Sequence, residues 1–161
     1  MGFFKRILFP VDLSEASKKI VPYVKEVMDK FGAELHIVRA TNVTQYYVAA
    51  YAGEAMPAIM AEEEKNIRAF ISSHLRDIPV RLKMLPGPPG PEIIRYAEEE
   101  NLDLIIMGHS STGTAKAIFG SVARYVVRYS PVPVLIISAG MLKNSVDKEK
   151  WHNTEALQRI M

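Results

Sequence analysis

The chain lacks cysteine and long apolar runs, and each absence excludes a class of function. With no cysteine among 161 residues, disulfide bonds, thiolate catalysis and sulfur-ligated metals are excluded. No apolar run approaches the roughly 20 residues of a membrane span, and the apolar part of the first residues is too short for a signal peptide. The net charge is only +2, without the basic stripe that binds nucleic acid. We therefore expect a cytoplasmic protein with no nucleic-acid or membrane partner.

What the sequence does contain is an alternation of apolar runs and helical periodicity. Hydrophobic residues make up 48% of the chain, enough for one folded domain, which we expect over residues 1–140. A partly helical extension is expected over residues 141–161, where Trp151, Leu157 and Ile160 line one side. This extension packs on its own domain, docks a partner or is disordered.

The order of the predicted elements indicates the fold class. Strands are predicted at residues 6–11, 33–41, 80–85, 102–107 and 132–138, and helices at 15–31, 58–75, 92–101 and 121–129. Continuous apolar strands alternating with helices indicate a parallel sheet with helices on both faces. We predict a Rossmann-like doubly wound α/β fold with strand order 3-2-1-4-5.

Local signals define some boundaries and leave others open. Ser14 is a candidate N-cap and Gly32 a stop for the first helix, while Pro22 is expected to kink that helix or delay its start. Residues 42–57 are predicted to form a long loop. Its Tyr46, Tyr47 and Tyr51 either pack on the domain, which is favoured, or form a lid over a ligand.

A ligand site is expected where strands one and four diverge. In this strand order the chain leaves them in opposite directions, which opens a crevice at their carboxyl ends. Asp12 follows strand one, and strand four leads into "GHSSTGTAKAIFGS". Gly108, Gly113 and the pair Gly120-Ser121 suit a backbone cradle for phosphate before a helix N-terminus, to which Lys116 and His109 would add charge.

Simpler interpretations stand beside this one. The glycines of that stretch suit tight turns, and Ser121 suits a plain N-cap. Asp12 is either a ligand contact or the start of an Asx-turn, and His109 is either an exposed loop residue, which is favoured, or a phosphate contact. His36 and His74 are expected to be structural or solvated. The acidic runs "EEEK" and "AEEEN" are expected to be solvated helix faces.

Other chemistry is poorly supported by the sequence. No P-loop lysine follows "GHSSTG", because Thr114 stands there, and no G-x-G-x-x-G follows strand one. We find no nucleophile with a base and an orienting partner, so slow ATP hydrolysis is the most that we expect. Mg²⁺ held by Asp12 together with ligand phosphates fits the general preference of this ion.

Five segments in order resemble the universal stress protein family: "ILFPVDLSE", "LHIVRA", the Gly-x-Pro at residues 87–89, "LDLIIMGHSSTG" and "FGSVARYVVRYSPVPVLII". The resemblance covers residues 5–138 and implies a site for ATP or AMP between strands one and four. By resemblance, the nucleotide-binding residues are Pro10, Val11, Asp12, Val38, Met107, Gly108, His109, Ser110, Ser111, Gly113, Gly120, Ser121 and Val122. The resemblance also implies a homodimer through the fifth strand, between Val132 and Ile137.

The glycine-rich stretch departs from the family pattern. The family's G-S-x-G-x-S-G is here "GHSSTG", one residue shorter, with Ser111 in place of a glycine. Either the hydroxyls of Ser110, Ser111 and Thr112 replace the lost backbone contacts, or the site has lapsed. The first alternative predicts an adenine-nucleotide-binding stress regulator or sensor with an unknown signalling partner. The second predicts a dimeric interaction scaffold that binds no nucleotide.

Overall fold

The computed structural model describes residues 3–41, 43–51, 53, 56–109 and 120–138. In chain order the elements are β1 (Arg6–Pro10), α1 (Glu15–Phe31), β2 (Glu34–Thr41), α2 (Val43–Tyr51), α3 (Met56–His74), β3 (Val80–Pro86), α4 (Pro89–Glu99), β4 (Leu104–His109), α5 (Ser121–Tyr129) and β5 (Val134–Ser138). The predicted extension at residues 141–161 lies outside the described residues.

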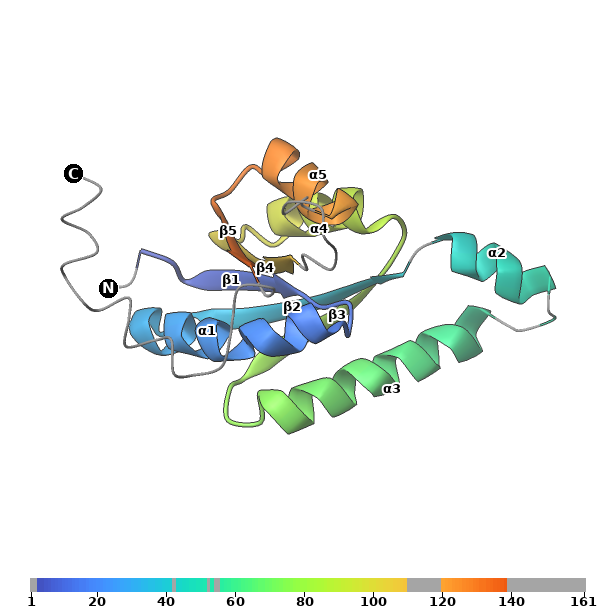
Figure 1. The fold of residues 1–161 in the computed structure, drawn as a ribbon, viewed down its shortest axis with the longest axis horizontal. Coiled ribbons are helices and arrows are strands. Elements are labelled where there is room, and N and C mark those ends of the chain that lie inside the picture. The colour runs from blue at the N-terminus through green and yellow to red at the C-terminus, as the bar shows by residue number, and fades with distance from the viewer. Residues whose placement is uncertain (1–2, 42, 52, 54–55, 110–119, 139–161) are drawn as a thin grey trace.

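The five strands form one parallel sheet in the order β3-β2-β1-β4-β5, which confirms the predicted fold class. Figure 1 shows α1 and α3 on one face of this sheet and α4 with α5 on the other. Two apolar clusters follow from that layering. One buries Ile20 and Ile67 against the first face, and the other buries Ile93 and Val126 against the second. The sheet is therefore covered on both sides, as its continuously apolar strands require.

The first helix begins and ends where the sequence indicates. The Ser14 side chain accepts a hydrogen bond from the Ser17 N–H at 3.3 Å, and Gly32 closes the helix in the left-handed conformation at φ 59°. Pro22 lies inside the helix without delaying its start, so that part of the expectation was wrong. Burial of Ile20, Val21 and Val24 on the sheet stabilises the segment despite the missing N–H of Pro22.

The expected loop at residues 42–57 was the main error in the predicted elements. Val43–Tyr51 is a helix, α2, and α3 already begins at Met56. No glycine or proline interrupts Val43–Tyr51, so nothing in this segment opposes a helix. Tyr47 and Tyr51 are 69% and 95% exposed. They neither pack on the domain nor line the cavity described below.

Two other boundaries moved by a few residues. α4 begins at Pro89 rather than at residue 92, because proline at the first helical position has its φ preset and needs no N–H partner. β4 extends to His109, which makes that residue the buried end of a strand and not the exposed loop residue that was favoured.

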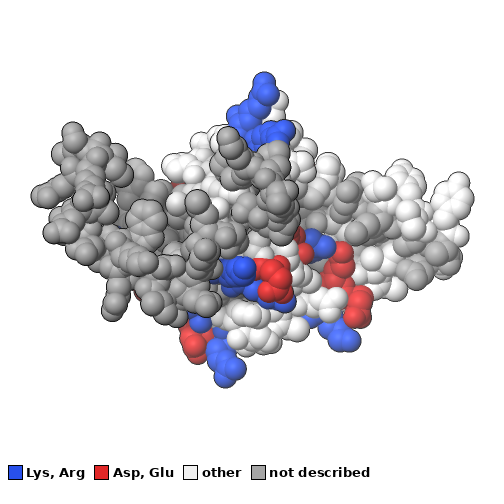
Figure 2. All heavy atoms as spheres, viewed as in Figure 1, with Lys and Arg blue, Asp and Glu red and all other residues white. Residues whose placement is uncertain are grey.

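The face of the molecule drawn in Figure 2 shows no field of one charge among the described residues. In Figure 2 lysine, arginine and acidic side chains are interspersed, and the region of α2 carries neither colour. Among the described residues, no helix combines the length and the apolar character that crossing a membrane requires.

Candidate functional site: a cleft at the carboxyl end of the sheet

A cavity of about 220 Å³ lies at the carboxyl ends of β1, β2 and β4, beside the N-terminus of α5. This is the switch point where open α/β sheets bind ligands. Ten of the predicted binding residues line it: Pro10, Val11, Asp12, Val38, Met107, Gly108, His109, Gly120, Ser121 and Val122. Ser110, Ser111 and Gly113, with the auxiliary Thr112 and Lys116, lie outside the described residues. Whether the ten residues bind a ligand stays a prediction.

The cavity has a polar and an apolar part. Asp12, Ser14, Ser17 and Arg39 contribute polar groups, whereas Val38, Ala40, Pro89, Ile93, Met107, Val122 and Ala123 contribute apolar surface. The apolar residues reach the cavity because Val38 and Ala40 face the same side of the sheet as α4 and α5. A mostly apolar pocket with a few placed polar groups is the usual form of a small-molecule site.

Asp12 is fixed by the turn that follows β1. Its Oδ1 accepts hydrogen bonds from the Ser14 N–H at 2.9 Å and from the Ser17 hydroxyl at 2.7 Å, so the predicted Asx-turn is present. Partial desolvation raises the pKa of Asp12, but these hydrogen bonds and the charge of Arg39 outweigh it and leave the pKa below its usual value. Asp12 therefore carries a negative charge at neutral pH.

Leu13, between Asp12 and Ser14, stores strain in this turn. Its φ is 63°, and the left-handed conformation costs a non-glycine residue roughly 1–2 kcal/mol. Burial of the neighbouring Ala16 and Ser17 holds the turn in place. The strained residue thus lies directly beside the carboxylate that lines the cavity, as is common at functional sites.

Two glycines at the cavity have different reasons to be glycine. A Cβ on Gly108 would lie 3.2 Å from the Ala16 carbonyl oxygen and 3.3 Å from Ile20, so glycine lets β4 pack closely on α1. Gly120 has φ −55° and a Cβ there would meet nothing within 4 Å. Neither its backbone conformation nor packing against the described residues requires glycine at position 120, and it borders the cavity.

The start of α5 bears on two predictions: that Ser121 is a plain N-cap, and that Gly120 and Ser121 open the helix beside the cavity. Gly120 is the N-cap and makes no side-chain cap hydrogen bond, while Ser121 is the first helical residue. Ser121 is therefore not a plain N-cap. The pair opens α5 beside the cavity, as predicted, and the first N–H groups of a helix favour an anion.

Sequence reasoning missed Arg39, the basic residue of β2 that lines the cavity. Its Nη2 lies 3.4 Å from Oε1 of Glu63 on α3, and the Thr41 hydroxyl donates to the other oxygen of Glu63. Glu63 belongs to the run "EEEK", so the expectation of a purely solvated face was wrong for this residue. The signal in the sequence was an arginine inside the mostly apolar strand "LHIVRA".

Metal binding has little support in the geometry. Over the described ranges, no group of three or more histidine, cysteine or acidic side chains is placed to hold a metal ion. Asp12 is the carboxylate that lines the cavity, and one carboxylate with ligand phosphates is a common Mg²⁺ arrangement.

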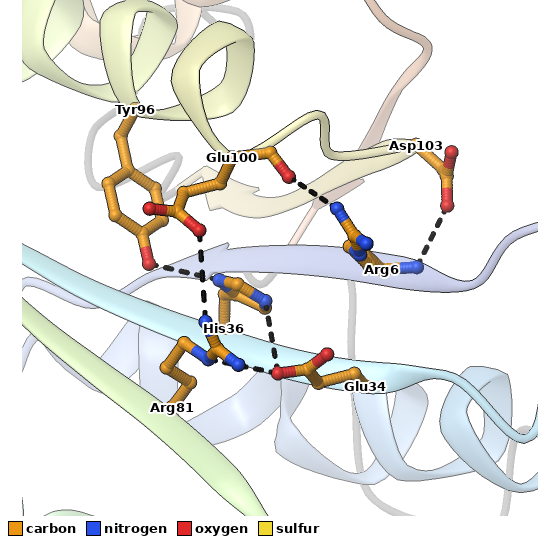
Figure 3. A network of polar contacts seen from close by, with 7 residues as sticks. All are labelled: Arg6, Glu34, His36, Arg81, Tyr96, Glu100 and Asp103. Atoms are coloured by element: carbon orange, nitrogen blue, oxygen red, sulfur yellow. Dashed lines mark hydrogen bonds and ion pairs between the residues drawn. The ribbon is translucent and has the colours of Figure 1, made fainter.

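A second polar cluster lies at the opposite, amino-terminal end of the sheet (Figure 3). The buried His36 on β2 has its Nδ1 2.9 Å from the Tyr96 hydroxyl on α4, so the structural role expected for it is confirmed. Arg81 on β3 lies 3.0 Å from Glu34 and 3.8 Å from Glu100. We call these five residues the amino-edge network.

Backbone contacts tie the same end of the sheet to β1. Arg6 Nη1 donates to the Glu100 carbonyl at 2.9 Å, and Asp103 Oδ2 accepts the N–H groups of Lys5 and Arg6, each at 2.8 Å. The other predicted structural histidine, His74, has its Nδ1 3.0 Å from the Phe70 carbonyl. These contacts join structural elements and lie outside the cavity.

The fold and the cleft together define a doubly wound α/β protein with a ligand site at its switch point. The model of the universal stress protein family matches residues 3–138. The chain therefore belongs to the universal stress protein family.

Individual relatives agree with this assignment. The chain is 32% identical to a universal stress protein of Thermus aquaticus over 137 residues, which covers 83% of this chain and 98% of the relative. It is 29% identical to universal stress protein MJ0577 of Methanocaldococcus jannaschii over 153 residues, covering 83% and 94%. The solved structure of MJ0577 superposes with a TM-score of 0.71 over 88% of this chain and 99% of that one.

Two more distant structures share the fold and were solved with ligands. A universal stress protein in complex with cAMP is 22% identical, with a TM-score of 0.57 over 84% of this chain and 98% of that one. A universal stress protein of Archaeoglobus fulgidus in complex with dAMP is 19% identical, with a TM-score of 0.63 over 83% and 98%.

Proposed function

We propose that this chain is a cytoplasmic stress-response regulator or sensor that binds ATP or AMP in the cleft at the carboxyl ends of β1 and β4. The observation that carries the proposal is Gly120, a glycine that neither its φ angle nor any neighbouring atom of the described residues requires, placed at the first turn of α5 and at the cavity. Open space beside a helix N-terminus suits an anion that approaches the backbone closely.

We assign a part of the nucleotide to each region of the cleft from the chemistry of its lining. Val38, Ile93 and Met107 offer apolar surface for the base, Asp12 offers a fixed carboxylate to the ribose, and Gly120 with Ser121 offers N–H groups to phosphate. The adenine nucleotides in two structures of the same fold support this ligand class. Mg²⁺, when present, would bind Asp12 together with phosphate oxygens.

Ligand content tests this proposal. The purified protein is extracted with acid and the extract is separated by chromatography, with added ATP and AMP titrated into the stripped protein as a second arm. We expect ATP, ADP or AMP in the extract or binding of the added nucleotide. An extract without adenine nucleotide, together with no heat of binding for either ligand, would reject the proposal.

A second candidate, a nucleotide-free dimeric scaffold, is favoured by one observation, the shortened stretch "GHSSTG" with Ser111 in place of the family glycine. Inserting one residue to restore the family spacing separates the two candidates. If the parent binds no nucleotide and the restored variant does, the scaffold is the better description. If both bind, the shortened stretch retains the function.

We further propose a homodimer through β5 for either candidate. β5 is an edge strand, and Leu135 on it is 39% exposed; pairing two such edges across a two-fold axis covers both. Leu135→Glu should yield a monomer in sedimentation velocity, whereas Tyr51→Glu on the distant α2 should remain a dimer. A wild-type monomer at micromolar concentration would contradict this interface.

A further inference from the structure

The polar side of the cleft contains an acid and a base that do not pair with each other. Asp12 and Arg39 both line the cavity, and the charge of Arg39 lowers the pKa of Asp12. Within the described part of the chain, however, Arg39 forms its ion pair with Glu63, and Asp12 bonds to Ser14 and Ser17. Two opposite charges that line one cavity without bonding to each other suit a ligand group that contacts both.

Each of the two residues has hydrogen-bonding capacity left over. A guanidinium has five N–H donors, yet among the described residues Arg39 donates one bond, from Nη2 to Glu63 at 3.4 Å, and its buried Nε has no partner. Asp12 uses Oδ1 twice, and its Oδ2 accepts no hydrogen bond from the described residues. Among the described residues, Oδ2 of Asp12 and N–H groups of Arg39 therefore have no partner, and both residues line the cavity.

Both side chains are anchored from outside the cavity. The Ser14 N–H and Ser17 hydroxyl hold the Asp12 carboxylate. Glu63, itself bonded by Thr41, holds the Arg39 guanidinium from α3. Among the described residues, the ion pair of Arg39 is thus with Glu63 and not with Asp12. Such fixed partners orient polar groups before a ligand arrives.

The ligand chemistry that fits an acceptor beside donors is a hydroxyl pair, because a hydroxyl donates one hydrogen bond and accepts others. We propose that Arg39 is a specificity-determining residue that, with Asp12, reads the ribose diol and selects ribonucleotides over 2′-deoxyribonucleotides. This inference rests on the proposed nucleotide function and deepens it. The carboxylate accepts from one hydroxyl, and the guanidinium donates to a hydroxyl oxygen.

The test compares AMP with 2′-deoxyAMP by titration calorimetry in EDTA, so that no metal contributes. Hydrogen bonds to charged groups predict that the wild type binds AMP about tenfold more tightly than 2′-deoxyAMP. Arg39→Met keeps an apolar stem and removes the donors. It should weaken AMP binding by about tenfold and 2′-deoxyAMP binding by less than about threefold, which erases the preference.

Two further variants separate recognition from folding. Arg39→Lys keeps a donor and should retain part of the preference for AMP. Glu63→Gln leaves Arg39 in place but loosens its anchor, so it should reduce the preference less than Arg39→Met does. Melting temperatures within a few degrees of wild type show that each variant is folded.

The outcomes distinguish this inference from the proposed function. If the wild type binds neither nucleotide, both are rejected. If Arg39→Met weakens AMP and 2′-deoxyAMP equally, or leaves the preference intact, Arg39 does not read the ribose, and nucleotide binding stands without it.

Discussion

Each end of the sheet carries a polar cluster, and the difference between the two clusters is that the one at the carboxyl end lines a cavity. At the amino end, Arg81 lies between Glu34 and Glu100, and His36 lies against Tyr96. At the carboxyl end, Arg39 and Asp12 line a cavity and, among the described residues, keep donors and acceptors without a partner. The charges of the amino-edge network join elements of the fold, whereas Asp12 and Arg39, each anchored by other residues, also line the cavity.

We expect the largest loss of nucleotide affinity from substitutions in the cleft. Asp12→Asn and Gly120→Val should each weaken ATP and AMP binding at least tenfold, and together more than about a hundredfold, because the first removes the charged acceptor and the second fills the approach to α5. Calorimetry on both nucleotides measures this. Glu100→Gln in the amino-edge network is the matched control and should bind like wild type. An equal loss of nucleotide affinity in Glu100→Gln would show that the effect is not confined to the cleft.

Gly108 and Gly120 both line the cleft, but we expect substitution to affect stability mainly at Gly108. Gly108→Val places methyl groups against the Ala16 carbonyl and Ile20, so we expect it to lower the free energy of unfolding by about 1–3 kcal/mol. Gly120→Val projects into open space and should cost less than about 1 kcal/mol, the scale of a changed N-cap residue. Urea denaturation measures both. A larger loss for Gly120→Val than for Gly108→Val would contradict the assigned roles.

We expect the amino-edge network to affect how stability depends on pH, and not to affect nucleotide binding. Desolvation lowers the pKa of His36 below its ordinary 6.5, opposed by Glu34 and Glu100 and assisted by Arg81 and Arg6. The folded state therefore binds its proton more weakly than the unfolded chain, so the stability that His36 contributes is complete above pH 6.5 and is lost as the pH falls through the folded pKa.

Melting temperatures between pH 7.5 and 5 measure this effect. His36→Gln removes the titrating group and should flatten the decline below pH 6.5. An identical pH profile for wild type and His36→Gln would show that His36 does not contribute to the decline.

The smallest effect should come from the exposed ion pairs of the network. Arg81 and its acidic partners are all substantially exposed, and such pairs contribute about 0.2–1 kcal/mol in general. Arg81→Gln should therefore reduce stability by less than about 1 kcal/mol and leave AMP affinity unchanged. Urea denaturation and calorimetry check the two halves of this statement, and a change in AMP affinity would link the two ends of the sheet.

The same contrast explains what the sequence predicts and what it does not. Strand order follows from β-α alternation and handedness, so the position of Asp12 and Gly120 at one cleft was predictable. Arg39 was not, because its role depends on Glu63, 24 residues away in the chain and brought beside it by the packing of α3. The helix α2 was missed because its apolar, tyrosine-rich sequence has no period that distinguishes it from a loop. The reason for glycine at position 108 was also not predictable from the sequence, because only the packing shows that α1 leaves no room for a side chain there.

The central claim is that the carboxyl-end cleft binds nucleotide while the amino-edge network serves the fold. Amide chemical-shift mapping during an AMP titration tests it most directly, because both ends are observed in one experiment. The account predicts saturable shifts at Val11, Val38, Arg39 and Gly120, with little change at Glu34, His36 and Tyr96. No shifts at the cleft, or shifts centred on the amino-edge network, would contradict it.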